Sequence, residues 1–108
     1  AYGSADEIVN LGYNTQNASA MAQVYDISGT YPTSVYSSDP LASEILWADG
    51  RVSLIELDGL VHSWPAGAGA SGTYISGNHI NYAMYLGEYF AAYNRRVPRE
   101  DGYWNFLD

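Results

Sequence analysis

The sequence predicts an α/β fold, and three observations lead to that prediction. Apolar residues recur at helical spacing in two segments, residues 14–27 and 78–94. Between these segments, Asp49-Gly50 separates two apolar runs, which indicates a β-hairpin because a type I′ turn needs positive φ at both central residues. A loop rich in glycine and proline follows the second run. The predicted order is strand end, helix, β-hairpin, histidine loop, helix.

The first helix is predicted over residues 14–27. Its apolar stripe consists of Ala18, Met21, Ala22 and Tyr25. Gly29 followed by Pro32 is expected to end the helix, in the order typical of a helix C-terminus. Residues 30–40 are rich in Ser, Thr, Tyr and Pro and are expected to form an ordered surface loop.

The hairpin is predicted to pair residues 43–48 with residues 51–58. Residues 52–57 are apolar at most positions, which is typical of a strand that is covered on both faces. The second helix, which Asn78 can cap, carries two apolar stripes. One stripe consists of Ile80, Ala83, Met84, Gly87, Phe90 and Ala91, and the other of Tyr82, Tyr85, Tyr89 and Tyr93.

His62 is the candidate general base. It follows an apolar strand and enters a Gly/Pro loop, where a rigid strand can hold an imidazole that the loop exposes. The alternative is a structural loop histidine. Asp6 is the chosen carboxylate partner, and Glu7 and Asp58 compete with it for that role. His79 is expected to be a surface or capping histidine.

Two motifs carry a family resemblance. Gly3-Ser4-Ala5-Asp6-Glu7-Ile8-Val9 fits the pattern G-[ST]-x-D-x-x-V, and the second motif fits G-x-x-H-x-W-P-x-G at Gly59, His62, Trp64, Pro65 and Gly67. On these motifs, residues 1–97 resemble the C-terminal part of an α/β-hydrolase esterase of the polyhydroxybutyrate depolymerase or feruloyl esterase type. The resemblance implies that Asp6 and His62 are the acid and base of a Ser-His-Asp triad, in the chain order of that fold. Trp64 is either a loop anchor or a residue that lines the substrate cleft.

The nucleophile of such an enzyme has no match in the sequence. No G-x-S-x-G elbow occurs, and the nearest approach, Gly69-Ala70-Ser71-Gly72, has the wrong spacing. The oxyanion-hole segment is also missing. The chain starts inside an expected strand, which favours a fragment or a processed piece. We therefore expect the serine on a missing preceding segment or a separate chain, and no esterase activity from this chain alone.

Composition narrows the function classes. The net charge of −8, with four Arg and no Lys, excludes a basic nucleic-acid footprint and argues against binding to a membrane surface. Cysteine is absent, so disulfides and cysteine ligands are excluded. A metal site formed by Asp6, His62 and another carboxylate is the weakest of the alternatives, because no histidine pair has ligand spacing. Neither a metal nor another cofactor is therefore expected. A Lys-free composition rich in Tyr, Asn and Ser favours an extracellular protein.

The expected substrate is a hydrophobic or polymeric ester. The alternative function is a non-catalytic remnant that binds a polymer or carbohydrate through Tyr and Trp side chains. Residues 98–108 form a separate aromatic tail that is expected to dock on the protein, because Tyr103, Trp104, Phe106 and Leu107 carry much apolar surface.

We predict that the chain is not a lone monomer. Residues 52–57 and the two stripes of residues 78–94 offer more apolar surface than two helices and a hairpin can cover, and a soluble monomer exposes patches of only a few hundred Å². A partner should therefore bury an apolar interface of more than about 2,000 Å². Light scattering checks this: a cooperatively unfolding species with the mass of one chain would contradict it.

Overall fold

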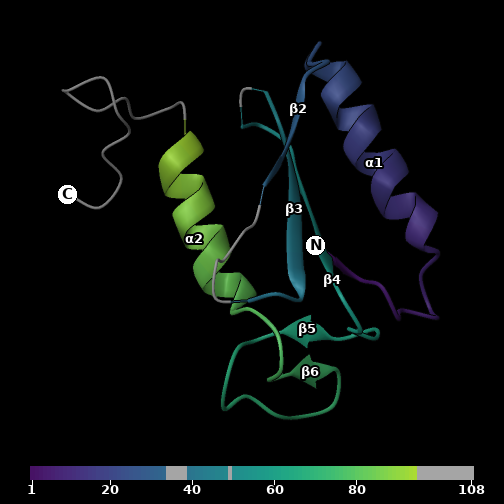
Figure 1. Cartoon of the computed structure of the whole chain (residues 1–108), viewed down its shortest axis with the longest axis vertical. Coiled ribbons are helices and arrows are strands. Elements are labelled where there is room, and N and C mark those ends of the chain that lie inside the picture. The colour runs from purple at the N-terminus through teal and green to yellow at the C-terminus, as the bar shows by residue number, and fades with distance from the viewer. Residues whose placement is uncertain (34–38, 49, 95–108) are drawn as a thin grey trace.

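A computed structural model describes residues 1–33, 39–48 and 50–94, and these form an α/β domain. Helix α1 (Leu11–Val24) lies on one side of a four-stranded sheet and helix α2 (Tyr82–Tyr93) on the other (Figure 1). The sheet has the order β1-β4-β3-β2, and its strands are β1 (Tyr2–Gly3), β2 (Thr30–Thr33), β3 (Ala42–Trp47) and β4 (Ser53–Leu57). A small sheet of β5 (Trp64–Pro65) and β6 (Ile75–Ser76) follows β4. The predicted α/β class is confirmed.

Strands β3 and β4 form the predicted hairpin. They pair antiparallel from Ala42↔Leu57 to Leu46↔Ser53. Gly50 has a φ of 77°, as the turn requires, whereas Asp49 lies outside the described residues, so the turn type stays a prediction. Strand β1 pairs with β4 in parallel, which makes the sheet mixed.

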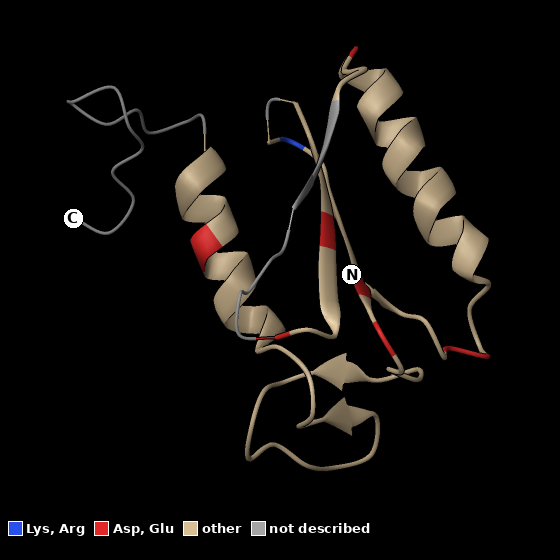
Figure 2. Ribbon diagram, viewed as in Figure 1, with Lys and Arg blue, Asp and Glu red and all other residues tan. Residues whose placement is uncertain are grey.

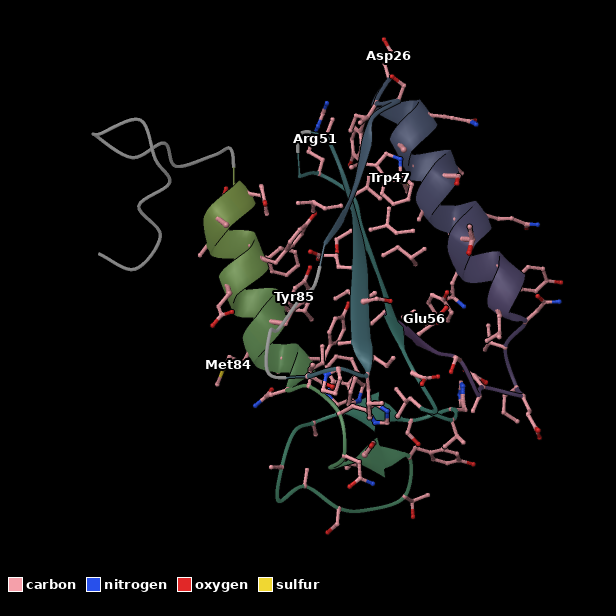
Figure 3. All side chains as sticks on the ribbon, in the orientation of Figure 1. Asp26, Trp47, Arg51, Glu56, Met84 and Tyr85 are labelled. Atoms are coloured by element: carbon pink, nitrogen blue, oxygen red, sulfur yellow. The ribbon has the colours of Figure 1, made fainter. Side chains whose placement is uncertain are left out.

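Each face of the sheet has its own core. On the α1 face the buried residues are Ala18, Ala22, Trp47, Val52 and Leu54, and on the α2 face they are Ala42, Ile55, Leu57, Leu60, Ile80 and Tyr85. Neighbouring residues of β4 point to opposite faces, so its continuous apolar run serves both cores. Figure 3 shows Trp47 between the sheet and α1, Tyr85 pointing from α2 toward the sheet, and Met84 pointing away from it.

The ends of α1 differ from the prediction. The helix begins at Leu11, not residue 14, because the Asn10 side chain accepts a hydrogen bond from the Gly12 amide at 2.8 Å. It ends at Val24 in a Schellman motif, in which Asp26 has a φ of 55° and the Ile27 amide donates to the Ala22 carbonyl at 2.9 Å.

The prediction that Gly29 and Pro32 end α1 was therefore wrong. Pro32 lies in β2, where it is aligned with Ile45 of β3. The loop predicted over residues 30–40 was also wrong for its first part, because Thr30–Thr33 form β2; residues 34–38 lie outside the described residues.

Helix α2 begins at Tyr82 because Asn81, not Asn78, caps it. The Asn81 side chain accepts a hydrogen bond from the Met84 amide at 3.1 Å. The tyrosine stripe faces the sheet, and the rings of Tyr82 and Tyr85 stack with centroids 5.9 Å apart. The predicted tail lies outside the described residues, so the division of the chain at residue 97 stays a prediction.

One carboxylate is buried among the described residues. Glu44 on β3 is 8% exposed and accepts hydrogen bonds from the hydroxyls of Ser53 and Tyr85, which lie 2.8 Å apart. Burial, together with the hydrogen bond to Glu44, raises the pKa of Tyr85 well above its usual range. The two hydroxyls thus compensate for burying this polar group.

Acidic residues occur on several elements, whereas Arg51 at the β3–β4 turn is the one Lys or Arg of the described residues (Figure 2). Its guanidinium lies 4.6 Å from the centre of the Tyr25 ring. None of the helices in the described ranges is long and apolar enough to cross a membrane.

Gly3 sits where the chain leaves β1 and touches the loop after β4. A Cβ atom at this position would lie 2.0 Å from the Leu60 carbonyl oxygen, so only glycine fits without a backbone shift. We predict that Gly3→Ala lowers the free energy of unfolding by about 2 kcal/mol or more, as overpacking does. Gly87→Ala is the control: a Cβ there meets nothing within 4 Å, so this helix substitution should stabilise by up to about 1 kcal/mol. Urea unfolding measures both, and equal effects would contradict the steric argument.

Candidate active site

Parallel pairing brings the two sequence motifs together. The C-terminal ends of β1 and β4 lie at the same edge of the sheet, since Gly3 is aligned with Leu57. Asp6 follows β1 and His62 follows β4, so both emerge at that edge. The turn that carries Asp6 (residues 3–9, the acidic turn) and the loop that carries His62 (residues 59–67, the histidine loop) therefore meet, although they are far apart in the sequence.

Backbone and hydroxyl contacts fasten the acidic turn to the histidine loop. The amide of Ala5 donates to the Leu60 carbonyl at 3.0 Å. The Ser4 hydroxyl donates to Oδ1 of Asp58 at 3.1 Å and accepts from the Gly59 amide at 2.8 Å. Gly59 has a φ of 76°, which a side chain would disfavour. The motif residues around Asp6 and His62 thus hold the two loops in register.

Asp6 divides its two carboxylate oxygens between two tasks. Oδ1 accepts the amides of Ile8 at 2.8 Å and Val9 at 3.0 Å, which folds the turn around the side chain. Oδ2 lies 3.0 Å from Nδ1 of His62. The hydrogen bond from His62 and those from the Val9 and Ile8 amides lower the pKa of Asp6. Asp6 therefore stays ionised through the neutral range.

The tautomer of His62 follows from this contact. A carboxylate only accepts, so Nδ1 of His62 carries the proton and Nε2 has a free lone pair in the neutral ring. The Asp6 side chain is 11% exposed and that of His62 is 46% exposed, so the acid is sheltered and the imidazole is accessible. The predicted hydrogen bond between these two residues is confirmed, while their catalytic roles remain predictions.

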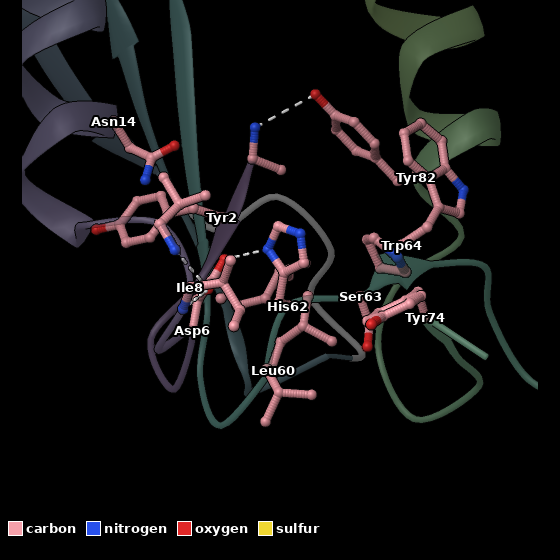
Figure 4. Close-up of a pocket in the computed structure, with 16 residues that line it drawn as sticks. Tyr2, Asp6, Ile8, Asn14, Leu60, His62, Ser63, Trp64, Tyr74 and Tyr82 are labelled. Carbon is pink, nitrogen blue, oxygen red and sulfur yellow. Dashed lines mark hydrogen bonds and ion pairs between the residues drawn. The ribbon is translucent and has the colours of Figure 1, made fainter.

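A pocket of about 610 Å³ opens beside His62, within the size range of ligand sites. Figure 4 shows the imidazole near its centre, with Asp6 and Ile8 on one side and Trp64 and Tyr74 on the other. Most lining side chains are apolar or aromatic: Tyr2, Ile8, Val9, Leu57, Leu60, Val61, Trp64, Pro65, Tyr74 and Tyr82.

Trp64 anchors the loop and also faces the pocket. Its amide donates to the Tyr74 carbonyl at 2.8 Å, and its ring meets that of Tyr82 edge to face with centroids 5.2 Å apart. The residue nevertheless remains 47% exposed. Both alternatives from the sequence are thus compatible with its position, and substrate binding by Trp64 stays a prediction.

The competing acid and the second histidine belong to the scaffold. Asp58 accepts the Ser4 hydroxyl and makes no contact with His62. Nε2 of His79 donates to the Asp58 carbonyl at 2.8 Å, and its Nδ1 lies 3.2 Å from the Ser76 hydroxyl. Glu7 is exposed. Within the described ranges, no group of three or more His, Asp or Glu side chains could hold a metal ion.

Two lining residues were missed by the sequence analysis. Tyr74 stands edge-on to the His62 ring, with centroids 6.1 Å apart. Tyr2 donates to Glu56 at 2.5 Å, and burial together with this contact raises the pKa of Tyr2 to about 12. The sequence signal for Tyr74 was weak, since the residue stands in a polar turn after Gly72.

Comparison with known proteins found one relative. The chain is 31% identical over 105 residues to a poly(3-hydroxybutyrate) depolymerase of Ralstonia pickettii. The chain is similar to a segment of a polyester depolymerase. The match covers 94% of this chain and 22% of the relative, so the chain spans about a fifth of the relative's length. No family model matches the chain, and no solved structure matches it.

The lowered pKa of Asp6 predicts how stability depends on pH. A carboxyl with a folded pKa below its unfolded value contributes stability above the unfolded pKa of about 3.8, and this contribution is lost as the pH falls through the folded pKa. The free energy of unfolding of wild type should thus exceed that of Asp6→Asn at pH 6, and the difference should shrink below about pH 4. Urea unfolding at several pH values measures it, with the exposed Glu7→Gln as control. A difference independent of pH would contradict the assignment.

Proposed function

We propose that this chain supplies the acid and the base of a serine carboxylic ester hydrolase that acts on hydrophobic or polymeric esters. The observation that carries the proposal is the orientation of His62, which gives Nδ1 to Asp6 at 3.0 Å and leaves Nε2 on the pocket side. The similarity to a depolymerase supports a polymeric ester as the substrate. A feruloyl-type aromatic ester is the narrower alternative.

The proposed mechanism uses His62 as a proton carrier. Nε2 takes the proton of the serine hydroxyl as its oxygen attacks the ester carbonyl, and Asp6 stabilises the imidazolium that forms. The tetrahedral intermediate then collapses, and the alcohol leaves with the proton from Nε2. A water molecule, deprotonated by Nε2 in the same way, then attacks the acyl-enzyme. The serine takes back the proton, and the carboxylic acid product is released. His62 is accessible enough to meet both the serine and the leaving alcohol.

The serine is proposed to come from a preceding segment or a separate chain with an α/β-hydrolase elbow. Among the described residues, no serine hydroxyl is hydrogen-bonded to His62. The matched region is 22% of the depolymerase, so the remaining part of such a protein is long enough to contain a segment of this kind. The site of action is proposed to be extracellular, where a polymer would be met.

A second candidate is a binding module without catalysis. Its support is the exposure of aromatic rings beside the pocket, 68% for Tyr74 and 47% for Trp64. Such rings could pack on a polymer or a sugar. The binding candidate does not require the contact between Asp6 and His62. Replacing His62 should therefore abolish ester hydrolysis but leave polymer binding unchanged, which distinguishes the two functions.

We predict that His62→Ala lowers turnover of a chromogenic short-chain ester by several orders of magnitude, because it removes the base. Asp6→Asn should also be severe, since the imidazole loses the partner that sets its tautomer. The assay uses the protein together with the segment or chain that carries the serine. His79→Gln is the matched control, because His79 contacts Asp58 and Ser76 rather than the pocket. Activity near wild type in His62→Ala would place the base elsewhere.

A further inference from the structure

Tyr74 has a backbone conformation that costs free energy. Its φ of 59° lies in the left-handed region, which bulky side chains rarely adopt. Hydrogen bonds on either side hold it there: its carbonyl accepts the Trp64 amide at 2.8 Å, and the Ile75 amide donates to the Gly72 carbonyl at 3.2 Å. The side chain is 68% exposed, so core packing does not compensate for the strain. Strain of this kind clusters at functional sites.

The strained backbone places the Tyr74 ring on the side of the pocket that Nε2 of His62 faces. The ring meets His62 edge to face, with centroids 6.1 Å apart and an interplanar angle of 79°. Figure 4 shows Tyr74 and Trp64 on the side of His62 away from Asp6. A group held on these rings would therefore lie beside the imidazole without competing for its contact with Asp6.

The chemistry of the wall limits what can bind there. Next to Tyr74 and Trp64, the exposed Val61 side chain adds further apolar surface to the lining. The one carboxylate in the lining is Asp6, and no Lys or Arg lines the described pocket. The amino group of Ala1 also lines the pocket, 3.4 Å from the Tyr82 hydroxyl, so the pocket holds a cationic group as well as the Asp6 carboxylate. The wall of Tyr74, Trp64 and Val61 itself carries no charged side chain, which suits an uncharged aliphatic ester segment.

We propose that Tyr74 is a substrate-binding residue, whose ring forms with Trp64 the wall that takes an uncharged aliphatic ester segment beside His62. This inference rests on the proposed function and deepens it. It explains the strained backbone of Tyr74 as the means by which the ring is placed beside His62.

Tyr74→Asn and Tyr74→Phe test the proposal. Asparagine tolerates the left-handed conformation better than tyrosine, so Tyr74→Asn should keep the melting temperature or raise it by about 4 °C. The same variant should raise KM for an uncharged trimer ester of 3-hydroxybutyrate about tenfold with little change in kcat, as expected for lost uniform binding. Tyr74→Phe keeps the ring, so its KM should lie closer to that of wild type than to that of Tyr74→Asn. The assay again includes the segment or chain that carries the serine.

Each outcome has one meaning. A higher KM in Tyr74→Asn with an unchanged or higher melting temperature supports the assignment. A loss of activity that accompanies a lower melting temperature assigns Tyr74 to packing and overturns it. Wild-type KM in Tyr74→Asn, measured while His62→Ala is inactive, overturns the role of Tyr74 and leaves the proposed function intact. Full activity in His62→Ala overturns the proposed function itself.

Discussion

The close backbone contact between Gly3 and Leu60 is the constraint on which the site depends. A Cβ at Gly3 would lie 2.0 Å from the Leu60 carbonyl oxygen, and the next contact, from the Ala5 amide to that same oxygen, is 3.0 Å long. Asp6 and His62 lie just beyond this junction. A side chain that separated the two loops would thus lengthen the hydrogen bond between Asp6 and His62, although Gly3 itself takes no part in that hydrogen bond.

The carboxylates near the site differ in what holds them. Asp6 cannot rotate freely, because two backbone amides bind one of its oxygens while His62 binds the other. Asp58 binds the Ser4 hydroxyl instead and secures the loop that carries His62. The turn geometry therefore decides which of the two aspartates is hydrogen-bonded to the His62 imidazole. The two histidines differ in a similar way, because both ring nitrogens of His79 are hydrogen-bonded to Ser76 and Asp58, whereas one nitrogen of His62 faces the pocket.

Local signals in the sequence predicted the elements better than their ends. The Asp-Gly pair and its flanking apolar runs predicted the β3–β4 hairpin, because turn chemistry and alternation act within a few residues. The helix starts were missed because more than one asparagine stands near each start, Asn10 and Asn14 for α1 and Asn78 and Asn81 for α2, and residue type alone does not distinguish between them. The pairing of Asp6 with His62 was reached through motif resemblance, since no local pattern joins residues so far apart. The position of Tyr74 could not be predicted, because it depends on a left-handed backbone conformation that tyrosine rarely adopts.

The buried carboxylate of Glu44 has a consequence for how the hairpin folds. Its two hydroxyl partners, Ser53 and Tyr85, lie on the α2 side of the sheet. Side chains alternate between faces, so a one-residue slip of β3 along β4 would turn Glu44 away from both hydroxyls. A carboxyl group without hydrogen-bond partners would then lie among the apolar side chains on the α1 face, at a cost of about 1–3 kcal/mol. Misaligned pairings of β3 with β4 would therefore be less stable than the native one, and Glu44 favours the native strand alignment.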